Sequence, residues 1–152
     1  MTIAVPIDCT GPPSPDLRRR VERARVLSLR DRDELLQGLV LGYRSGDRPL
    51  WAPLIVDLME TSIRIRVSRY RPEGPTMAMA DVYQDLVCAV LEDALSIPLD
   101  GPAFLERRLL LRSADRVTRG LQGEARYQEG IESLEFWAGE HANDDSDEED
   151  PQ

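Results

Sequence analysis

The sequence predicts an all-α protein, a bundle of four or five helices. Three observations support this fold class. Apolar residues recur at intervals of three and four along most of the chain. Clusters of proline and glycine separate these stretches, and no turn sequence joins two segments of alternating polarity, so no strand finds a pairing partner. With 152 residues, the chain is long enough for one domain with flanking tails.

Composition divides the chain into three parts. Residues 1–15 contain four prolines and a glycine, which favours a disordered or loosely draped leader. Residues 140–152 hold seven acids and no Arg or Lys, as is typical of a disordered acidic tail. The net charge of −9 is mainly a property of this tail, because residues 1–139 carry 21 acids against 19 arginines. We expect the helical domain over residues 16–139.

The first helix is expected to begin at Asp16, as its N-cap, and to run to Leu29. Leu17, Val21 and Ala24 supply a thin apolar stripe, and arginines dominate the remaining positions. This basic segment could be an arm that binds nucleic acid or a solvated helix face, and we favour the second interpretation.

The next helix is expected to begin at Asp33 and to end at Gly46. Gly38 and Gly42 each weaken it by about 1 kcal/mol relative to alanine. Their four-residue spacing would allow another helix to approach closely.

Residues 47–70 fit two patterns. Residues 63–67 alternate between apolar residues and arginine, as in a half-buried strand. Apolar residues at intervals of three or four also trace two stripes along the whole segment. Because a lone strand would have nothing to pair with, we predict a central helix that is apolar on two sides, with Pro53 tolerated in its first turn.

An acidic helix is predicted to follow from residue 81. Val82, Leu86 and Val90 have the spacing of a buried face, and Asp81 is expected to be the N-cap. The opposite face carries three acids, Asp81, Asp85 and Glu92. This face either binds a protein with a basic surface or is simply solvated.

An arginine-rich helix is predicted to begin after Pro102 and to end at Gly120. Five arginines stand against only two acids in it: Arg107, Arg108, Arg112, Arg116 and Arg119. Guanidinium groups pair bidentately with oxyanions, so this face could lie along the phosphates of DNA. Alternatively, the arginines bridge to neighbouring acidic helices. A last, weak helix is expected around residues 127–137.

Catalysis, metal binding and secretion find little support in the sequence. Cys9 and Cys88 do not make a disulfide framework, and one histidine leaves a Cys/His metal site short of ligands. We therefore expect a protein that is not an enzyme and has no cofactor. No apolar run resembles a signal peptide or the ~20 residues of a membrane span, so a cytoplasmic location is expected.

Several landmarks follow one another in a fixed order between residues 33 and 121. They are Gly46-Asp47, Trp51, Asp85-Leu86-Val87, Ala94-Leu95, Phe104-Leu105 and Asp115. In this order and spacing they resemble the first conserved domain of bacterial RNA polymerase sigma factors of the extracytoplasmic-function type.

The resemblance implies a domain that binds core polymerase and melts promoters. In that family the acidic helix binds a basic coiled coil of the largest polymerase subunit, and the following helix and loop bind the promoter. By resemblance, Asp81, Asp85 and Glu92 would face the polymerase or another protein with a basic surface. The five arginines of the next helix would lie toward DNA.

The chain departs from the family pattern at several positions. Cys88-Ala89 stands where the family usually has Gln-Glu, Phe104 where it has Trp, and Leu111 where it has Asn. The loop over residues 96–102 lacks aromatic residues to trap flipped bases, and no second DNA-binding domain is expected. We therefore expect weak DNA binding at most. The alternative function is a non-catalytic protein-interaction module that kept the helical scaffold without DNA recognition.

Overall fold

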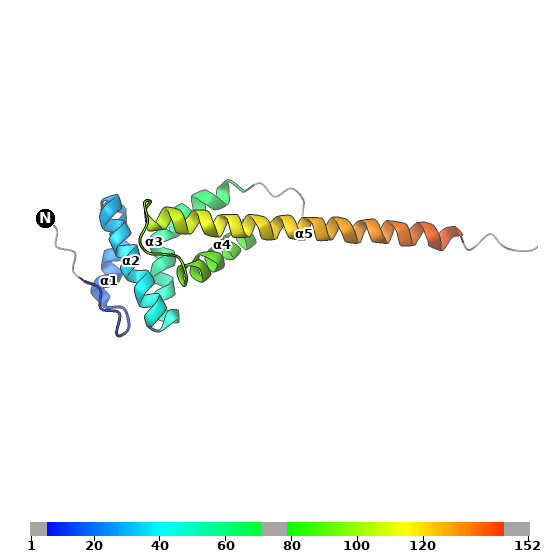
Figure 1. Ribbon diagram of the computed structural model, residues 1–152. Helices are drawn as coiled ribbons and strands as arrows, with labels where there is room; N and C mark the ends of the chain where they lie inside the picture. The colour runs from blue at the N-terminus through cyan, green and yellow to red at the C-terminus, as the bar shows by residue number, and fades with distance from the viewer. Residues whose placement is uncertain (1–5, 71–78, 145–152) are drawn as a thin grey trace, which may run out of the picture. The chain divides into compact units, whose positions relative to one another are not determined.

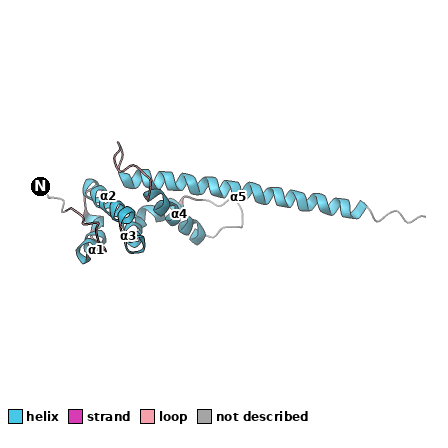
Figure 2. Ribbon diagram, turned by 60° about the horizontal axis from the view of Figure 1, so that its bottom comes forward, coloured by secondary structure: helices cyan, strands magenta, loops and turns pink. Residues whose placement is uncertain are grey.

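The computed structural model describes residues 6–70 and 79–144, and of residues 125, 128 and 131–144 it describes the backbone alone. The described residues form helices joined by loops, with no strand among them (Figures 1 and 2). The elements are α1 (Pro15–Glu22), the 3-10 helix η1 (Ala24–Val26), α2 (Leu29–Ser45), α3 (Arg48–Ser68), α4 (Met79–Ala94) and α5 (Leu105–Asp144). The predicted all-α class with four or five helices is confirmed, and α3 confirms the choice of helix over strand for residues 47–70.

Contacts divide the chain into two units, Met1–Val117 and Thr118–Gln152. The hydrophobic core lies in the first unit, where α2, α3, α4 and the first turns of α5 supply the largest fully buried side chains. Among them are Leu36, Trp51, Met59, Leu86 and Leu109. Within the described residues, no helix has an apolar stretch long enough to cross a lipid bilayer.

Serines cap the first two α-helices, and both helices begin before the aspartates at which they were predicted to start. Ser14 Oγ accepts a hydrogen bond from the backbone N–H of Leu17 at 3.2 Å, so α1 begins before Asp16. Ser28 Oγ accepts from the backbone N–H of Asp31 at 3.1 Å, so α2 begins four residues before Asp33. The single helix expected over residues 16–29 is therefore wrong, because the chain leaves α1 at Glu22 and forms η1 before α2 starts.

The close approach expected beside the glycines of α2 is made by a side chain. Trp51 of α3 is fully buried, and its ring lies directly against Gly42. A Cβ added at Gly42 would overlap the six-membered part of that ring, and one added at Gly46 would lie 2.7 Å from its Nε1 atom. Trp51 Nε1 has no hydrogen-bond partner among the described residues. The absence of side chains at Gly42 of α2 and at its C-cap residue Gly46 thus makes room for the indole.

The described part of the leader, residues 6–14, is a loop that contacts α2. Ile7 packs directly on Gly38, and Cys9 Sγ lies 3.8 Å from the carbonyl oxygen of Gly38. Residues 1–5 lie outside the described residues. At the other end, residues 140–144 belong to α5, and the rest of the expected acidic tail also lies outside the described residues.

α4 begins at Met79, which places Asp81 in its first turn rather than at an N-cap. At the C-terminal end of α4, an arginine from α2 donates hydrogen bonds to backbone carbonyls. Arg44 Nε donates to the carbonyl oxygen of Ala94 at 2.8 Å, and Arg44 Nη2 donates to that of Ile97. The Ala94 carbonyl is one that a helix C-terminus leaves without a backbone partner, and the Ile97 carbonyl belongs to the loop that follows α4.

α5 starts on a cap supplied by α2. Asp33 Oδ1 accepts a hydrogen bond from the backbone N–H of Leu105 at 2.6 Å, so Asp33 caps α5 rather than its own helix. The predicted end of this helix at Gly120 is wrong, and the weak helix expected around residues 127–137 is the continuation of α5. A glycine within a helix costs about 1 kcal/mol, and the sequence has no proline between Gly120 and Asp144 that would stop the helix.

A second contact ties α2, α3 and α5 together beside that cap. The guanidinium of Arg32 forms a bidentate ion pair with Glu106, at 2.8 and 3.0 Å, and also donates to the carbonyl oxygen of Leu58. Ser62 Oγ donates to the same Glu106 carboxylate at 2.6 Å. Glu106 is thereby used inside the fold and does not balance the arginines on the outer face of α5.

Candidate functional site

The acidic face predicted on α4 is present as an exposed stripe. Asp81, Asp85, Cys88 and Glu92 are all exposed, and their spacing places them on one side of the helix. The other side of α4 is buried in the core. We call these four residues the acidic stripe.

The members of the acidic stripe differ in whether the fold already uses them. Asp81 and Asp85 have no ion pair with any residue that the structure describes. Glu92 Oε2 lies 2.7 Å from Arg116 Nη1 of α5. The side chains of this pair are 65% and 47% exposed, so it contributes about 1 kcal/mol at most. The unused carboxylates therefore lie toward the N-terminal end of α4.

Asp93, which is not among the residues predicted from the sequence, is the buried carboxylate that links α4 to α5. Its side chain is fully buried. The carboxylate accepts a hydrogen bond from Ser113 Oγ at 2.9 Å, lies 3.3 Å from Arg112 Nε, and pairs with Arg116 Nη2. The available signal was its position: Asp93 continues the apolar stripe of α4 after Leu86 and Val90. An acid on a buried face requires a partner.

The arginines predicted to face DNA are largely engaged within the fold. Arg108 donates to three backbone carbonyls in the loop before α5, those of Pro98 at 2.6 Å, Leu99 at 3.1 Å and Ala103 at 3.0 Å. Arg112 and Arg116 bind Asp93, as the alternative interpretation of bridging to an acidic helix describes.

The other two arginines of the predicted set are exposed. Arg107 has no ion pair or hydrogen bond with the described residues. Arg119 belongs to the second unit and, unlike Arg107, is not without an interaction partner. The structure therefore brings the acidic and basic helices into contact with each other, instead of presenting two separate charged faces of equal strength.

A hydrogen-bonded group connects α3 to the first half of α4. Tyr83 Oη donates to Glu60, and Arg64 pairs with Glu60 while its Cζ atom lies 5.4 Å from the centre of the Tyr83 ring. The Tyr83 hydrogen bond lowers the pKa of Glu60 below its ordinary value of 4.5; partial burial opposes this shift and Arg64 reinforces it. The same hydrogen bond raises the pKa of Tyr83 above its ordinary value of 10.0.

The described residues contain no group of three or more His, Cys, Asp or Glu side chains that could hold a metal ion. Comparison of the chain with protein-family models, with curated proteins and with solved structures finds no match. The resemblance to sigma factors therefore depends on the landmark residues alone.

Proposed function

We propose that this chain is a non-catalytic helical module that binds another protein through the acidic stripe of α4. The observation that carries the proposal is the state of Asp81 and Asp85, which lie one turn apart, both exposed and both without an ion pair in the described structure. Two such carboxylates can steer a basic partner and set its register on the helix. A partner rich in arginine or lysine would complement them.

RNA polymerase is the partner that the resemblance to sigma factors implies. The basic coiled coil of its largest subunit has the required charge, and the Asp85-Leu86-Val87 landmark lies within α4 with Asp85 exposed and Leu86 buried. That arrangement supports docking through Asp85 over a helix anchored by Leu86. Promoter DNA is the less favoured partner, because Arg108, Arg112 and Arg116 already bind groups of the fold.

Cys88 provides a direct test, because it is exposed in the middle of the acidic stripe. In a Cys9→Ser background, a photoreactive benzophenone attached to Cys88 should crosslink to the largest subunit when purified core RNA polymerase is added. Adding Asp85→Arg should reduce that crosslink strongly while leaving the melting temperature nearly unchanged, because Asp85 is exposed, unpaired and beyond the first turn of α4.

Two controls make the result specific. The same label on Leu41→Cys, an exposed position of α2, in a chain without the native cysteines should give no crosslink. A basic protein of unrelated fold, cytochrome c, should crosslink at Cys88 far less than polymerase does. Equal crosslinking to cytochrome c would indicate nonspecific electrostatic attraction. The absence of a crosslink to polymerase would exclude polymerase as the partner.

A further inference from the structure

Five arginines at the N-terminal end of the fold are not used inside it. Arg18, Arg19, Arg20, Arg23 and Arg25 belong to α1, η1 and the residue between them, and none has an ion pair with a described residue. All but Arg20 are exposed. We call them the arginine surface. Residues 15–30 hold six arginines against two acids, a local charge of +4 in a chain whose net charge is −9.

This surface differs from the arginine-rich part of α5. There Arg112 and Arg116 meet a buried carboxylate and Arg108 meets three carbonyls, so their charges are largely satisfied. On α1 and η1 the like charges repel one another, and the two acids of this segment, Asp16 and Glu22, offset only part of the positive charge. Such a cluster attracts an anionic partner, which could be a nucleic acid, a lipid surface or an acidic protein segment.

Exposed aliphatic side chains beside the arginines favour a protein. Val26 is 86% exposed, Leu29 68% and Leu27 36%, and they directly follow Arg25 in the chain. Phosphates would leave these side chains in water, whereas an apolar partner face would cover them. Residues 6–30 also contain no aromatic residue on which a base could stack. The chemistry therefore calls for a partner that is both acidic and apolar.

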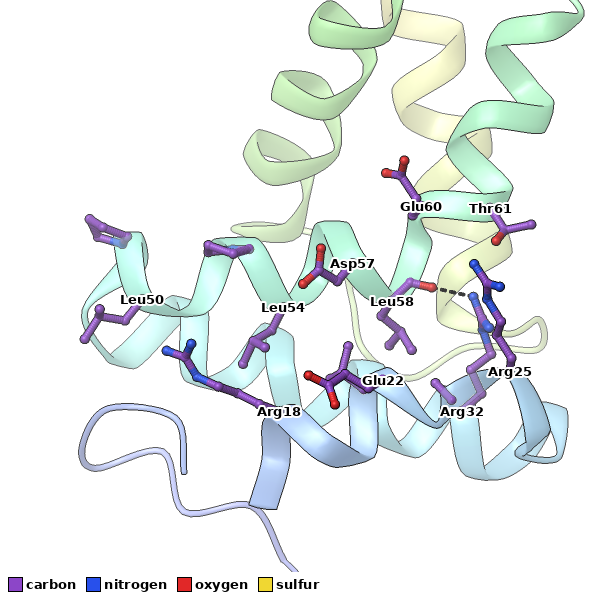
Figure 3. Close-up of a pocket in the computed structure, with 14 residues that line it drawn as sticks. Arg18, Glu22, Arg25, Arg32, Leu50, Leu54, Asp57, Leu58, Glu60 and Thr61 are labelled. Atoms are coloured by element: carbon purple, nitrogen blue, oxygen red, sulfur yellow. Dashed lines mark hydrogen bonds between the residues drawn. The ribbon is translucent and has the colours of Figure 1, made fainter. Parts of the chain in front are cut away.

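A groove next to the arginine surface favours a protein segment over a lipid surface as the partner. It has a volume of about 530 Å³ and lies between α1 and η1 on one side and α3 on the other (Figure 3). Val21, Leu50 and Leu54 contribute apolar lining, and Arg18 and Arg25 line it as well. A concave surface of this kind can receive side chains from a helix, which a flat bilayer surface does not supply.

The groove also contains acids, and these define the partner further. Glu60 is already bound by Tyr83 and Arg64. Glu22 and Asp57 line the groove without an ion pair to a described residue, and they can accept hydrogen bonds from a partner's polar groups. Arg19 and Arg23 do not line the groove, and it is these two arginines that would bind the acidic side chains of the partner.

We propose that the arginine surface, the aliphatic residues Val26 and Leu29, and this groove form one docking site for an acidic amphipathic segment of another protein. The apolar face of the segment covers Val26 and Leu29 and enters the groove, while its carboxylates meet Arg19 and Arg23. This site is independent of the acidic stripe on α4, since it lies on α1, η1, the start of α2 and α3, and takes a partner of opposite charge.

The test uses the full chain and four probes. The first is a labelled amphipathic helical peptide of about 18 residues with Leu on one face and Glu on the other. The second has Ser in place of each Leu, the third is a DNA duplex of mixed sequence, and the fourth is a vesicle of phosphatidylcholine and phosphatidylserine. Binding of each is measured with the unsubstituted chain, with Arg19→Glu/Arg23→Glu and with Val26→Ser/Leu29→Ser. Arg107→Glu is the matched control, because Arg107 is exposed and unpaired but lies on α5.

The Leu/Glu peptide should bind best, and each double variant should weaken it about tenfold or more. Arg107→Glu should change the affinity for the Leu/Glu peptide by less than about twofold. The proposal is overturned if the Ser/Glu peptide binds as tightly, if DNA or vesicles bind and the Leu/Glu peptide does not, or if Arg107→Glu matches the effect of the double variants. It is equally overturned if no probe binds at low salt, because the surface is then merely hydrated.

Discussion

The carboxylate of Asp93 in α4 lies 3.3 Å from the guanidinium Nε of Arg112 in α5, with the acid fully buried and the arginine 45% exposed. Arg116 completes the contact from the next turn of α5 and is 47% exposed. This difference in burial decides what each substitution does. An arginine that loses Asp93 returns to water, but Asp93 without its arginines is a buried charge with only Ser113 as a partner.

Removing both arginines should therefore be costly. Arg112→Ala/Arg116→Ala should lower the free energy of unfolding by about 3 kcal/mol, since breaking a buried pair leaves an uncompensated charge. Adding Asp93→Asn should recover part of this loss, because a neutral amide can keep the hydrogen bond with Ser113 without a buried charge. Chemical denaturation of the three proteins checks both statements, and a triple variant less stable than the double would contradict them.

Two glycines of the fold should respond to alanine in opposite directions. At Gly42 the new Cβ meets the Trp51 ring, so Gly42→Ala should destabilise the protein by about 1–3 kcal/mol despite the better helix propensity of alanine. At Gly120 no heavy atom lies within 4 Å of the added Cβ, so Gly120→Ala should stabilise α5 by about 0.5–1 kcal/mol. Thermal unfolding of the two variants measures the difference, and stabilisation by both would show that Trp51 can move aside.

Periodicity predicted which segments are helical, but not where the helices begin and end. Residues 47–70 could be assigned because the two apolar stripes fit a buried helix and a lone strand would have had no partner, and α3 has Trp51, Ile55 and Ile63 fully buried. The caps could not, because Asp33 and Ser28 are equally good N-cap residues in sequence. Their roles differ because Asp33 accepts a hydrogen bond from the backbone N–H of Leu105, 72 residues later in the chain.

The same limit applies to the candidate site. Spacing alone placed Asp81, Asp85 and Glu92 on one exposed face, because the face of a helix is a local property. Which arginines are available is a tertiary property. Asp93 of α4 pairs with Arg112 and Arg116 of α5, about 20 residues later in the chain, and no local sequence pattern predicts that pairing.

The contact between Glu60 and Tyr83 should make a small, pH-dependent contribution to stability. The pKa of Glu60 is lowered by this hydrogen bond, so the stabilisation is present above pH 4.5 and is lost as the pH falls through the folded-state pKa. Glu60→Gln should thus cost most near neutral pH and almost nothing once the pH is below the lowered folded-state pKa, with a maximum under about 1 kcal/mol because the Glu60 side chain is 29% exposed.

Urea unfolding at several pH values measures this dependence. Tyr83→Phe removes the same hydrogen bond and should show the same trend, and the double variant should cost less than the two single changes added together. A cost of Glu60→Gln that does not vary with pH would contradict the assignment.

The two thiols should react at different rates in the folded protein. Burial raises the pKa of the Cys9 thiol above its ordinary value of 9.0, and the neighbouring Asp8 carboxylate adds to the shift. Cys88 is exposed. Because the thiolate is the nucleophile, iodoacetamide at about pH 8 should label Cys88 before Cys9. Mass spectrometry of Cys9→Ser and Cys88→Ser gives the two rates, which should converge in denaturant; faster labelling of Cys9 in the native protein would disprove the prediction.

Arginines of α5 should contribute little to DNA binding. Arg108, Arg112 and Arg116 would each have to give up a partner in the fold to meet a phosphate. If Arg107 makes the main contact, the logarithm of the affinity should fall with the logarithm of the salt concentration with a slope of about −1 to −2. Deleting residues 140–152 removes seven acids and changes the net charge from −9 to −2, which should strengthen binding equally to promoter-like and random duplexes. Fluorescence anisotropy over a salt series checks both statements. A slope of about −5 that Arg112→Ala/Arg116→Ala makes shallower but Arg19→Glu/Arg23→Glu does not would mean that the α5 arginines leave their carboxylates and carbonyls to bind DNA.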